Sequence, residues 1–183
     1  MKILLPLFYL PPISWFSEFL KEENEIILEQ FENFPKQTYR NRCNIAGANG
    51  QLALTIPVEK SKGARMLTRD VRISEHSDWQ LQHWRSIESA YNSTPFFEYY
   101  KDDLLPFYEQ DWTFLWDFNI EIQAKMLELL DLQVDIQLTK EYKVDFDENV
   151  LDARNSIHPK KETDTGSLKK YYQVFEQRFG FIP

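Results

Sequence analysis

The apolar residues near the start of the chain form two short runs with a helix-like stretch between them. Ile3–Leu10 and Glu25–Glu29 are apolar enough to be buried strands. Between them, the aromatic residues of Ser14–Lys21 recur at helical spacing. The order strand, helix, strand favours parallel pairing of the two strands. The sequence therefore predicts a layered α/β fold that starts with a β-α-β unit.

Alternation with a period of two follows and predicts a hairpin. Tyr39–Ile45 and Leu52–Val58 are strand-like, and Asn49-Gly50 between them is a pair favoured in tight hairpin turns. In the first arm the odd-numbered residues should share one face, and the even-numbered residues should share the other. A further short strand is expected over 70–73.

From Ser77 onward the apolar spacing becomes helical. We expect one helix over 77–92, a strongly aromatic helical segment bounded by Pro95 and Pro106, and a third helix over 113–130. Val134–Leu138 alternates like a late strand.

The last part of the chain is more polar. The segment 145–166 is expected to be a mobile loop, and a last helix is expected over 167–179. The predicted fold class is α/β, with a mixed sheet, a β-α-β start, a central β-hairpin and a helical C-terminal half. At 183 residues the chain is expected to form a single domain, residues 1–183.

The composition indicates a cytoplasmic protein. Hydrophobic residues make up 43% of the chain, so burial can offset chain entropy without crosslinks. The single cysteine, Cys43, excludes an internal disulfide and favours a reducing compartment. Pro6, Pro11 and Pro12 argue against a signal peptide, and no stretch approaches the roughly 20 apolar residues that span a bilayer. We expect no membrane insertion.

The charge distribution suggests an anionic small molecule rather than a nucleic acid as partner. The net charge is −8, which disfavours nonspecific binding to phosphate backbones. Between Pro35 and Arg72, however, eight cations face only two acids. This asymmetry creates a local positive field that could attract a small anion such as a nucleotide-sugar. The alternative is a solvated strand face and loop.

The densest group of candidate binding residues is the segment Lys36–Arg42, which has three cations, two amides and no acid. Because alternate side chains of a strand point the same way, Arg40 and Arg42 would project side by side and could hold a diphosphate or a carboxylate. The alternative is an edge strand kept soluble by its charges. The candidate substrate-binding residues here are Lys36, Gln37, Tyr39, Arg40, Asn41 and Arg42.

Two residues are candidates for a catalytic role. His83 flanks an apolar helix face, and the ordinary pKa of histidine near neutrality makes it a plausible general base. A lone histidine beside such a face is more often structural. Asn119 falls inside the apolar stripe of its predicted helix. A buried amide without partners costs about 1–3 kcal/mol, so Asn119 should have a specific hydrogen-bond partner, usually backbone.

The aromatic residues add further candidates. The run Pro95–Tyr100, with Glu98 inside it, and Tyr91 shortly before it could contact a sugar or a base. Core packing is the more frequent use of such residues. Cys43 is expected to be a small buried residue rather than a nucleophile.

No sharp catalytic motif is present. The chain has no glycine-rich phosphate loop, no paired-histidine zinc motif and no nucleophile elbow. Its three histidines are far apart in sequence. The residues therefore point to no metal site, and no cofactor is evident from them.

Several motifs taken together resemble the WbqC-like family over nearly the whole chain. They are Tyr9-Leu10-Pro11 with Trp15-Phe16, Lys36-Gln37 with Tyr39–Arg42, Asn49-Gly50 with Leu54–Val58, Trp79, His83-Trp84, Ser89–Tyr91 and Pro95–Tyr100. Members of that family occur with genes for O-antigen and surface polysaccharide synthesis, and a glycine-transferring role has been suggested for some. The resemblance implies an enzyme that transfers an acyl or aminoacyl group to an activated sugar, a nucleotide-sugar in our interpretation. The alternative is a noncatalytic module that binds a glycan precursor or a glycosyltransferase partner.

Two features depart from the family pattern. Many relatives carry a His-Gln pair before the Tyr-Leu-Pro element, where this chain has Leu5 and Pro6. A catalytic role of that histidine in relatives would therefore not transfer. Relatives also continue beyond the ending Gly180–Pro183, so we expect a shortened C-terminus. The reaction, its donor and acceptor, and the oligomeric state stay open.

Overall fold

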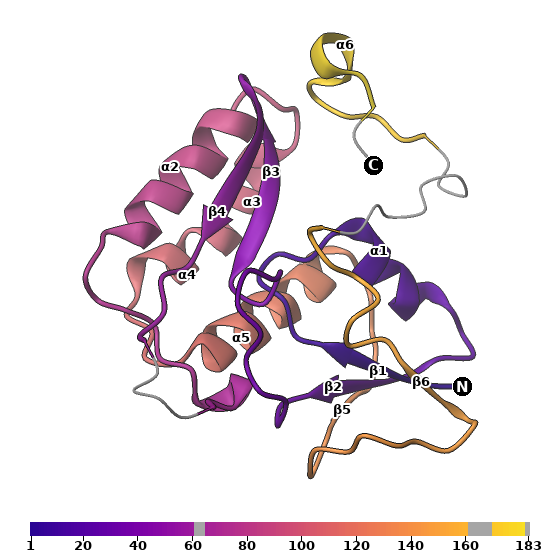
Figure 1. Cartoon of the computed structure of the whole chain (residues 1–183). Helices are drawn as coiled ribbons and strands as arrows, with labels where there is room; N and C mark the ends of the chain where they lie inside the picture. The colour runs from indigo at the N-terminus through magenta and orange to yellow at the C-terminus, as the bar shows by residue number, and fades with distance from the viewer. Residues whose placement is uncertain (61–64, 161–169, 182–183) are drawn as a thin grey trace.

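The computed structural model describes residues 1–60, 65–160 and 170–181, and a four-stranded parallel sheet lies on one side of it (Figure 1). Its strands are β1 (Lys2–Pro6), β2 (Glu25–Glu29), β5 (Ile136–Leu138) and β6 (Val150–Asp152), in the order β5-β2-β1-β6. Neighbouring strands are parallel throughout, with Ile3 opposite Ile26 and Leu5 opposite Leu28.

The predicted β-α-β start is confirmed. Between β1 and β2 the chain forms the short helix α1 (Ile13–Phe16) and the 3-10 turn η1 (Ser17–Leu20). Trp15 of α1 is fully buried, and its indole Nε1 donates to the Pro6 carbonyl at 2.9 Å. The ring thus anchors α1 to the end of β1.

The predicted hairpin is also confirmed, and it forms a separate two-stranded sheet. β3 (Arg42–Gly47) and β4 (Gly50–Thr55) pair antiparallel around Ala48 and Asn49. Gly50 has φ +107°, which only glycine adopts without strain. The strands of this α/β fold are therefore divided between the parallel sheet and this hairpin.

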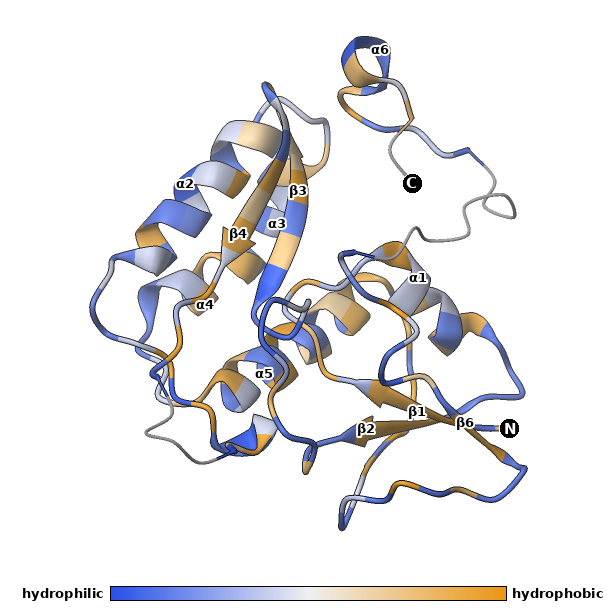
Figure 2. Ribbon diagram, viewed as in Figure 1, coloured by the Kyte–Doolittle hydropathy of each residue, from blue (hydrophilic) through white to orange (hydrophobic). Residues whose placement is uncertain are grey.

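The helices of the C-terminal half cover the hairpin. They are α2 (Trp79–Tyr91), α3 (Phe97–Leu104), α4 (Pro106–Glu109) and α5 (Leu115–Leu129), so the three predicted helices are present and α4 is added. Figure 2 shows apolar residues concentrated along β1 and β2 and on one side of α5.

Helix α5 joins two apolar cores. One core lies between the hairpin and α2–α5, and Phe118 and Ile122 of α5 are completely buried in it. The other core lies around the sheet and includes Trp116 and Leu127 from the same helix. Because α5 contributes to both, it fixes the hairpin half relative to the sheet half.

Three local predictions need correction. The segment expected to be a strand over 70–73 begins as the 3-10 turn η2 (Thr68–Asp70) and makes only isolated bridges at Arg72 and Ile73. The segment 145–166, of which 161–166 lies outside the described residues, contains strand β6. A strand of three residues gives too short an apolar pattern to stand out from its polar surroundings.

The last predicted helix is much shorter than expected. Residues 167–169 lie outside the described part, and beyond them the only helix is α6 (Glu176–Phe179). Figure 1 shows α6, in yellow, standing apart from the rest of the molecule, and Tyr172 before it is 83% exposed. A segment that buries so little gains little from tertiary packing to extend a helix.

Candidate functional site

The strand order changes direction at β1, which marks the loop after this strand as a candidate binding region. The chain passes from β1 to β2 and β5 in one direction, then returns to place β6 on the other side of β1. In open parallel sheets, ligands bind where the order reverses in this way, just beyond the carboxyl ends of the strands. The loop that follows β1 contains Leu10 at φ +40°, a value rare for a residue with a side chain. This loop is therefore a candidate wall of a binding site.

A cavity of about 400 Å³ lies against this loop, and we call it the tyrosine cleft. Its walls come from the loop after β1, the hairpin, the end of α2 and the C-terminal segment. The lining residues are Leu10, Pro11, Pro12, Ile13, Ser14, Tyr39, Asn44, Ile45, Ala46, Gln51, Tyr91, Tyr171, Tyr172, Gln173 and Val174.

The chemistry of the tyrosine cleft is neutral and suited to a hydroxylated ring. Four tyrosines offer aromatic faces for stacking, and the amides Asn44, Gln51 and Gln173 can donate and accept hydrogen bonds. None of these lining residues, all of them from the described ranges, carries a charge. The cleft therefore fits an uncharged polar ligand better than a phosphate.

Two of the predicted binding residues meet in this cleft. Tyr39 and Tyr91 both line it. Tyr39 is hydrogen-bonded to Asn44, and burial raises the pKa of its phenol, an effect that this hydrogen bond opposes. Tyr91 is hydrogen-bonded to the Ala46 backbone, and its pKa is likewise raised, chiefly by burial. Both phenols therefore stay protonated at neutral pH and can act as hydrogen-bond donors.

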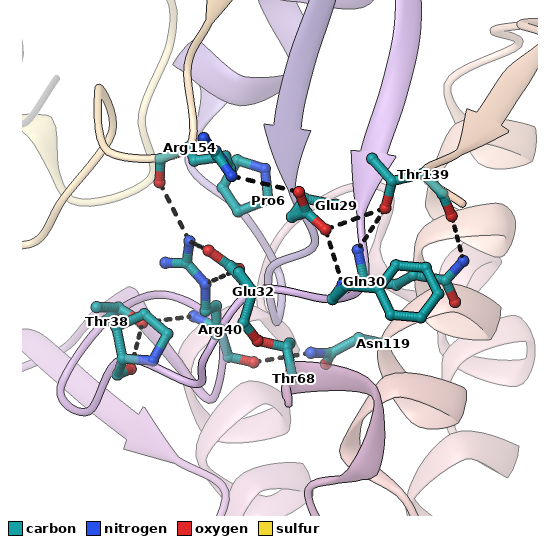
Figure 3. A network of polar contacts seen from close by, with 12 residues as sticks. Pro6, Glu29, Gln30, Glu32, Thr38, Arg40, Thr68, Asn119, Thr139 and Arg154 are labelled. Carbon is teal, nitrogen blue, oxygen red and sulfur yellow. Dashed lines mark hydrogen bonds and ion pairs between the residues drawn. The ribbon is translucent and has the colours of Figure 1, made fainter. Parts of the chain in front are cut away.

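The basic segment is divided by the fold. Arg40 is only 2% exposed, and its guanidinium binds the Glu32 carboxylate through two bonds of 2.5 and 2.7 Å (Figure 3). Arg42 instead lies on the outer face of the hairpin, where its Nε donates to Thr55 Oγ1 at 3.1 Å. The expectation of two guanidinium groups side by side thus does not match the structure, because Arg40 precedes β3 and turns inward.

The other members of the segment also have separate surroundings. Lys36 and Gln37 are exposed, and Gln37 has φ +61°. Asn41 is buried, and its side-chain amide donates to the Ile56 carbonyl at 2.8 Å. Glu98 is exposed on α3 and does not line the tyrosine cleft.

Arg40 belongs to a buried ionic cluster that the sequence analysis missed. Glu29, completely buried at the end of β2, pairs with Arg154 beyond β6 at 3.3 Å (Figure 3). Arg154 also pairs with Asp152 at 2.7 Å, and the Arg154 carbonyl accepts a bond of 3.1 Å from Arg40. Burial raises the pKa of the Glu32 carboxyl, although Arg40 opposes this. These ion pairs and hydrogen bonds join the end of β2, the segment after β6 and the residues before β3.

His83 is buried in a chain of hydrogen bonds rather than placed in the cleft. It is 4% exposed, and its Nδ1 lies 2.9 Å from Tyr9 Oη, which in turn lies 2.9 Å from Tyr108 Oη. Burial lowers the pKa of His83 to about 4, although a hydrogen bond with the Thr55 backbone opposes this shift. Burial also raises the pKa of the Cys43 thiol to about 12. At neutral pH the imidazole is thus uncharged and Cys43 is a thiol.

Asn119 has the backbone partner expected for a buried amide. Its Nδ2 donates to the Arg40 carbonyl at 2.7 Å, and Gln123, one turn later on α5, donates to the Phe8 carbonyl at 3.1 Å. The Tyr9 N–H also donates to the Tyr39 carbonyl at 2.8 Å. Helix α5 therefore holds together the two segments that carry Leu10 and Tyr39 into the cleft.

The lining residues missed from the sequence had weak signals. Asn44 lies two residues from Arg42 in β3, so the two side chains share one face of the hairpin. This alternation is the sequence signal that could have identified Asn44. Tyr171 and Tyr172 fell in a segment predicted to be helical.

Among the described residues, no group of three or more His, Cys, Asp or Glu side chains could hold a metal ion. No helix in the same ranges is long and apolar enough to cross a bilayer.

Comparisons with known proteins identify a family. A family model described as "WbqC-like protein family" matches residues 8–173. A curated protein of Mycobacterium tuberculosis (strain ATCC 25618 / H37Rv), described as "Uncharacterized protein Rv1507c", is 27% identical over 103 residues. That alignment covers 56% of this chain and 44% of the relative, so the chain spans less than half the length of the protein it matches. No solved structure matches the chain significantly.

Proposed function

The chain belongs to the WbqC-like protein family, and we propose that it binds an activated sugar and transfers an acyl or aminoacyl group to it in surface polysaccharide synthesis. The observation that carries this proposal is the neutral cleft of tyrosines and amides between the loop that follows β1, the hairpin and the end of α2. A nucleotide-sugar is a cytoplasmic metabolite, so a cytoplasmic location is part of the proposal.

The sugar ring occupies the tyrosine cleft. Pyranose rings present C–H groups on one face and hydroxyls around the edge, which suits stacking on Tyr39 or Tyr91 with amide contacts at the rim. Asn44 and Gln51 supply amides from the two hairpin strands. Each amide both donates and accepts, as a hydroxyl requires of its partners.

The phosphate groups lie outside the cleft and contact Arg42. Arg42 is two residues from Asn44 on the same strand face, which is about 7 Å along a strand. Its bond to Thr55 orients the guanidinium over the outer face of the hairpin. Of the other predicted residues, Lys36 and Gln37 are exposed on the turn before β3 and are further candidates for phosphate contacts, whereas Asn41 is buried.

Transfer requires a nucleophile and a donor with a leaving group. A hydroxyl or amino group of the bound sugar attacks the acyl carbon of an acyl or aminoacyl ester or thioester. The new C–O or C–N bond forms, the bond to the leaving group breaks, and the proton of the nucleophile passes to that group.

His83 and Asn119 act as positioning residues in this proposal. His83 orients Tyr9, and the Tyr9 N–H holds the Tyr39 carbonyl. Asn119 holds the neighbouring Arg40 carbonyl. Both therefore influence the placement of Tyr39 without contacting the reacting atoms.

A noncatalytic binding module is the second candidate. It is favoured by the neutral lining of the cleft, by the burial of His83 and by the raised pKa of the Cys43 thiol. Such a module would bind a glycan precursor or a glycosyltransferase partner.

Calorimetry with a panel of nucleotide-sugars tests the binding step. The exposed double variant Asn44→Ala/Gln51→Ala should lose about tenfold or more in affinity. The matched control is Gln133→Ala/Asn149→Ala, exposed amides that do not line the cleft, and it should bind as the wild type does. No binding of any nucleotide-sugar by the intact protein would refute the proposal.

Two further measurements separate the candidates. The affinity for the nucleotide-sugar should fall with added salt and with Arg42→Ala. Arg85 is an exposed arginine on α2, and Arg85→Ala should change neither the affinity nor its dependence on salt. Mass spectrometry of the sugar after incubation with acyl and aminoacyl donors should detect the transferred group. Binding without any transfer across that donor panel would assign the protein to the noncatalytic class.

A further inference from the structure

We infer that an apolar groove beside the tyrosine cleft binds the unbranched hydrocarbon chain of a fatty acyl donor. The groove has a volume of about 450 Å³ and lies between the hairpin and helices α2, α3 and α5. This inference rests on the proposed acyl transfer and names the donor class for it. The volume is within the usual range for sites of small molecules.

The lining of the groove is almost entirely apolar. Ile45, Ile87, Phe97, Ile122, Met126 and Leu129 form much of its surface. All the lining residues belong to the described ranges, and none of them is charged. Apart from the tyrosines, only Thr94 among these residues has a polar side chain. A ligand part placed here gains stability from burial of apolar surface, at about 25 cal/mol per Å².

The buried hydroxyl among the lining residues of the groove, that of Tyr108, already has a partner. Tyr108 is 6% exposed, and its hydroxyl lies 2.9 Å from that of Tyr9, away toward His83. Phe96 at the rim is 65% exposed, so apolar surface faces solvent here. The groove thus offers hydrophobic contact, and the buried Tyr108 hydroxyl requires no hydrogen-bonding group from the ligand.

The groove and the tyrosine cleft are neighbouring cavities with common walls. Leu10, Ile45 and Tyr91 line both. A fatty acyl group in the groove would therefore place its carbonyl near these residues, beside a sugar in the cleft. This continuity is the reason for assigning the groove to a chain that ends in a reacting carbonyl rather than to a separate protein partner.

The test uses straight-chain alkanoates of six to twelve carbons, below their micellar concentrations, with the intact protein in calorimetry. Affinity should rise about fourfold per methylene until the groove is full. Met126→Trp fills the groove from α5 and should abolish this dependence. Ala124→Trp, the same change at an exposed position of α5, is the matched control and should retain it.

Several outcomes would overturn the inference. They are an affinity independent of chain length, an equal response of the two tryptophan variants, or binding of geranyl phosphate but of no alkanoate, which would point to a branched lipid carrier. A concentration-dependent dimer that only Met126→Trp dissociates would assign the groove to a second copy of the chain.

The result is separable from the proposed function. Met126→Trp should leave nucleotide-sugar affinity unchanged, while Asn44→Ala/Gln51→Ala should leave alkanoate affinity unchanged. If the wild-type protein binds a nucleotide-sugar but no alkanoate, only the groove assignment is refuted. Alkanoate binding in a protein that binds no nucleotide-sugar refutes the proposed function.

Discussion

The buried ionic cluster at the ends of β2 and β6 and the tyrosine cleft beside the loop after β1 have opposite chemistry. The cluster holds the charged residues Glu29, Glu32, Arg40 and Arg154, which pair with one another or with the backbone. The cleft has no charged lining residue and exposes rings and amides. The comparison teaches that the charged residues of the cluster stabilise the fold, whereas neutral residues line the cavity that is open to solvent.

The largest expected effect comes from breaking the cluster. Arg40→Met leaves the Glu32 carboxylate buried without its partner and should lower the free energy of unfolding by about 3–5 kcal/mol. Urea denaturation measures this. Lys36→Met, an exposed cation of the same segment, is the control and should stay within about 0.5 kcal/mol. Equal effects of the two would contradict a structural role for Arg40.

Asn119→Ala should have the next largest effect. It leaves the Arg40 carbonyl without its donor and creates a small cavity, so the free energy of unfolding should fall by about 2–4 kcal/mol. Asp117→Ala, two residues earlier and exposed on α5, is the control. If Asn119→Ala lowered nucleotide-sugar turnover without any loss of stability, Asn119 would belong to the cleft instead.

Because His83 is buried as the ionic cluster is, it should make the free energy of unfolding depend on pH. Its pKa in the folded state is about 4, below the ordinary 6.5, so the unfolded chain binds this proton more tightly. The stability that His83 contributes is present above pH 6.5 and is lost as the pH falls toward 4. Between pH 7 and pH 5 the loss should be about 2 kcal/mol.

Denaturation of wild type and His83→Gln at both pH values isolates this contribution. The pH-dependent loss should be smaller in the variant by that amount, because the amide does not titrate. An identical pH dependence in the two proteins would mean that His83 is accessible to solvent, which would strengthen its candidacy as a general base.

The smallest effect on stability is expected in the cleft. Asn44→Ala should change the free energy of unfolding by less than about 0.5 kcal/mol, because this side chain is exposed. A larger loss in thermal or urea denaturation would show that the cleft residues support the fold as the ionic cluster does.

The sequence predicted elements that depend on local pattern. Glu25–Glu29 was placed correctly as strand β2, and the hairpin followed from alternation around Asn49-Gly50. Helix α5 followed from its apolar stripe, and the backbone partner of Asn119 followed from the cost of an unpaired buried amide. In each case the deciding information lay within about 20 residues.

Long-range pairing explains most of what was missed. Arg154 reaches Glu29 across a sequence separation of 125 residues, and no local pattern marks either residue as paired. The inward turn of Arg40 depends on Glu32, which precedes the turn at 35–38. Tyr39 and Tyr91 were predicted to contact substrate, yet the cleft that unites them also needs Leu10 and Tyr171 from opposite ends of the chain.

Leu10 combines a rare backbone conformation with a place in the lining of both cavities. Its backbone is held at φ +40°, where glycine would be more comfortable, while its side chain lines both cavities. A glycine here would relax the loop but remove a side chain from the shared lining of the tyrosine cleft and the apolar groove. Selection of variants for heat resistance alone would therefore favour glycine here and widen both cavities, whereas use of the two cavities as separate sites would favour leucine despite its strained backbone.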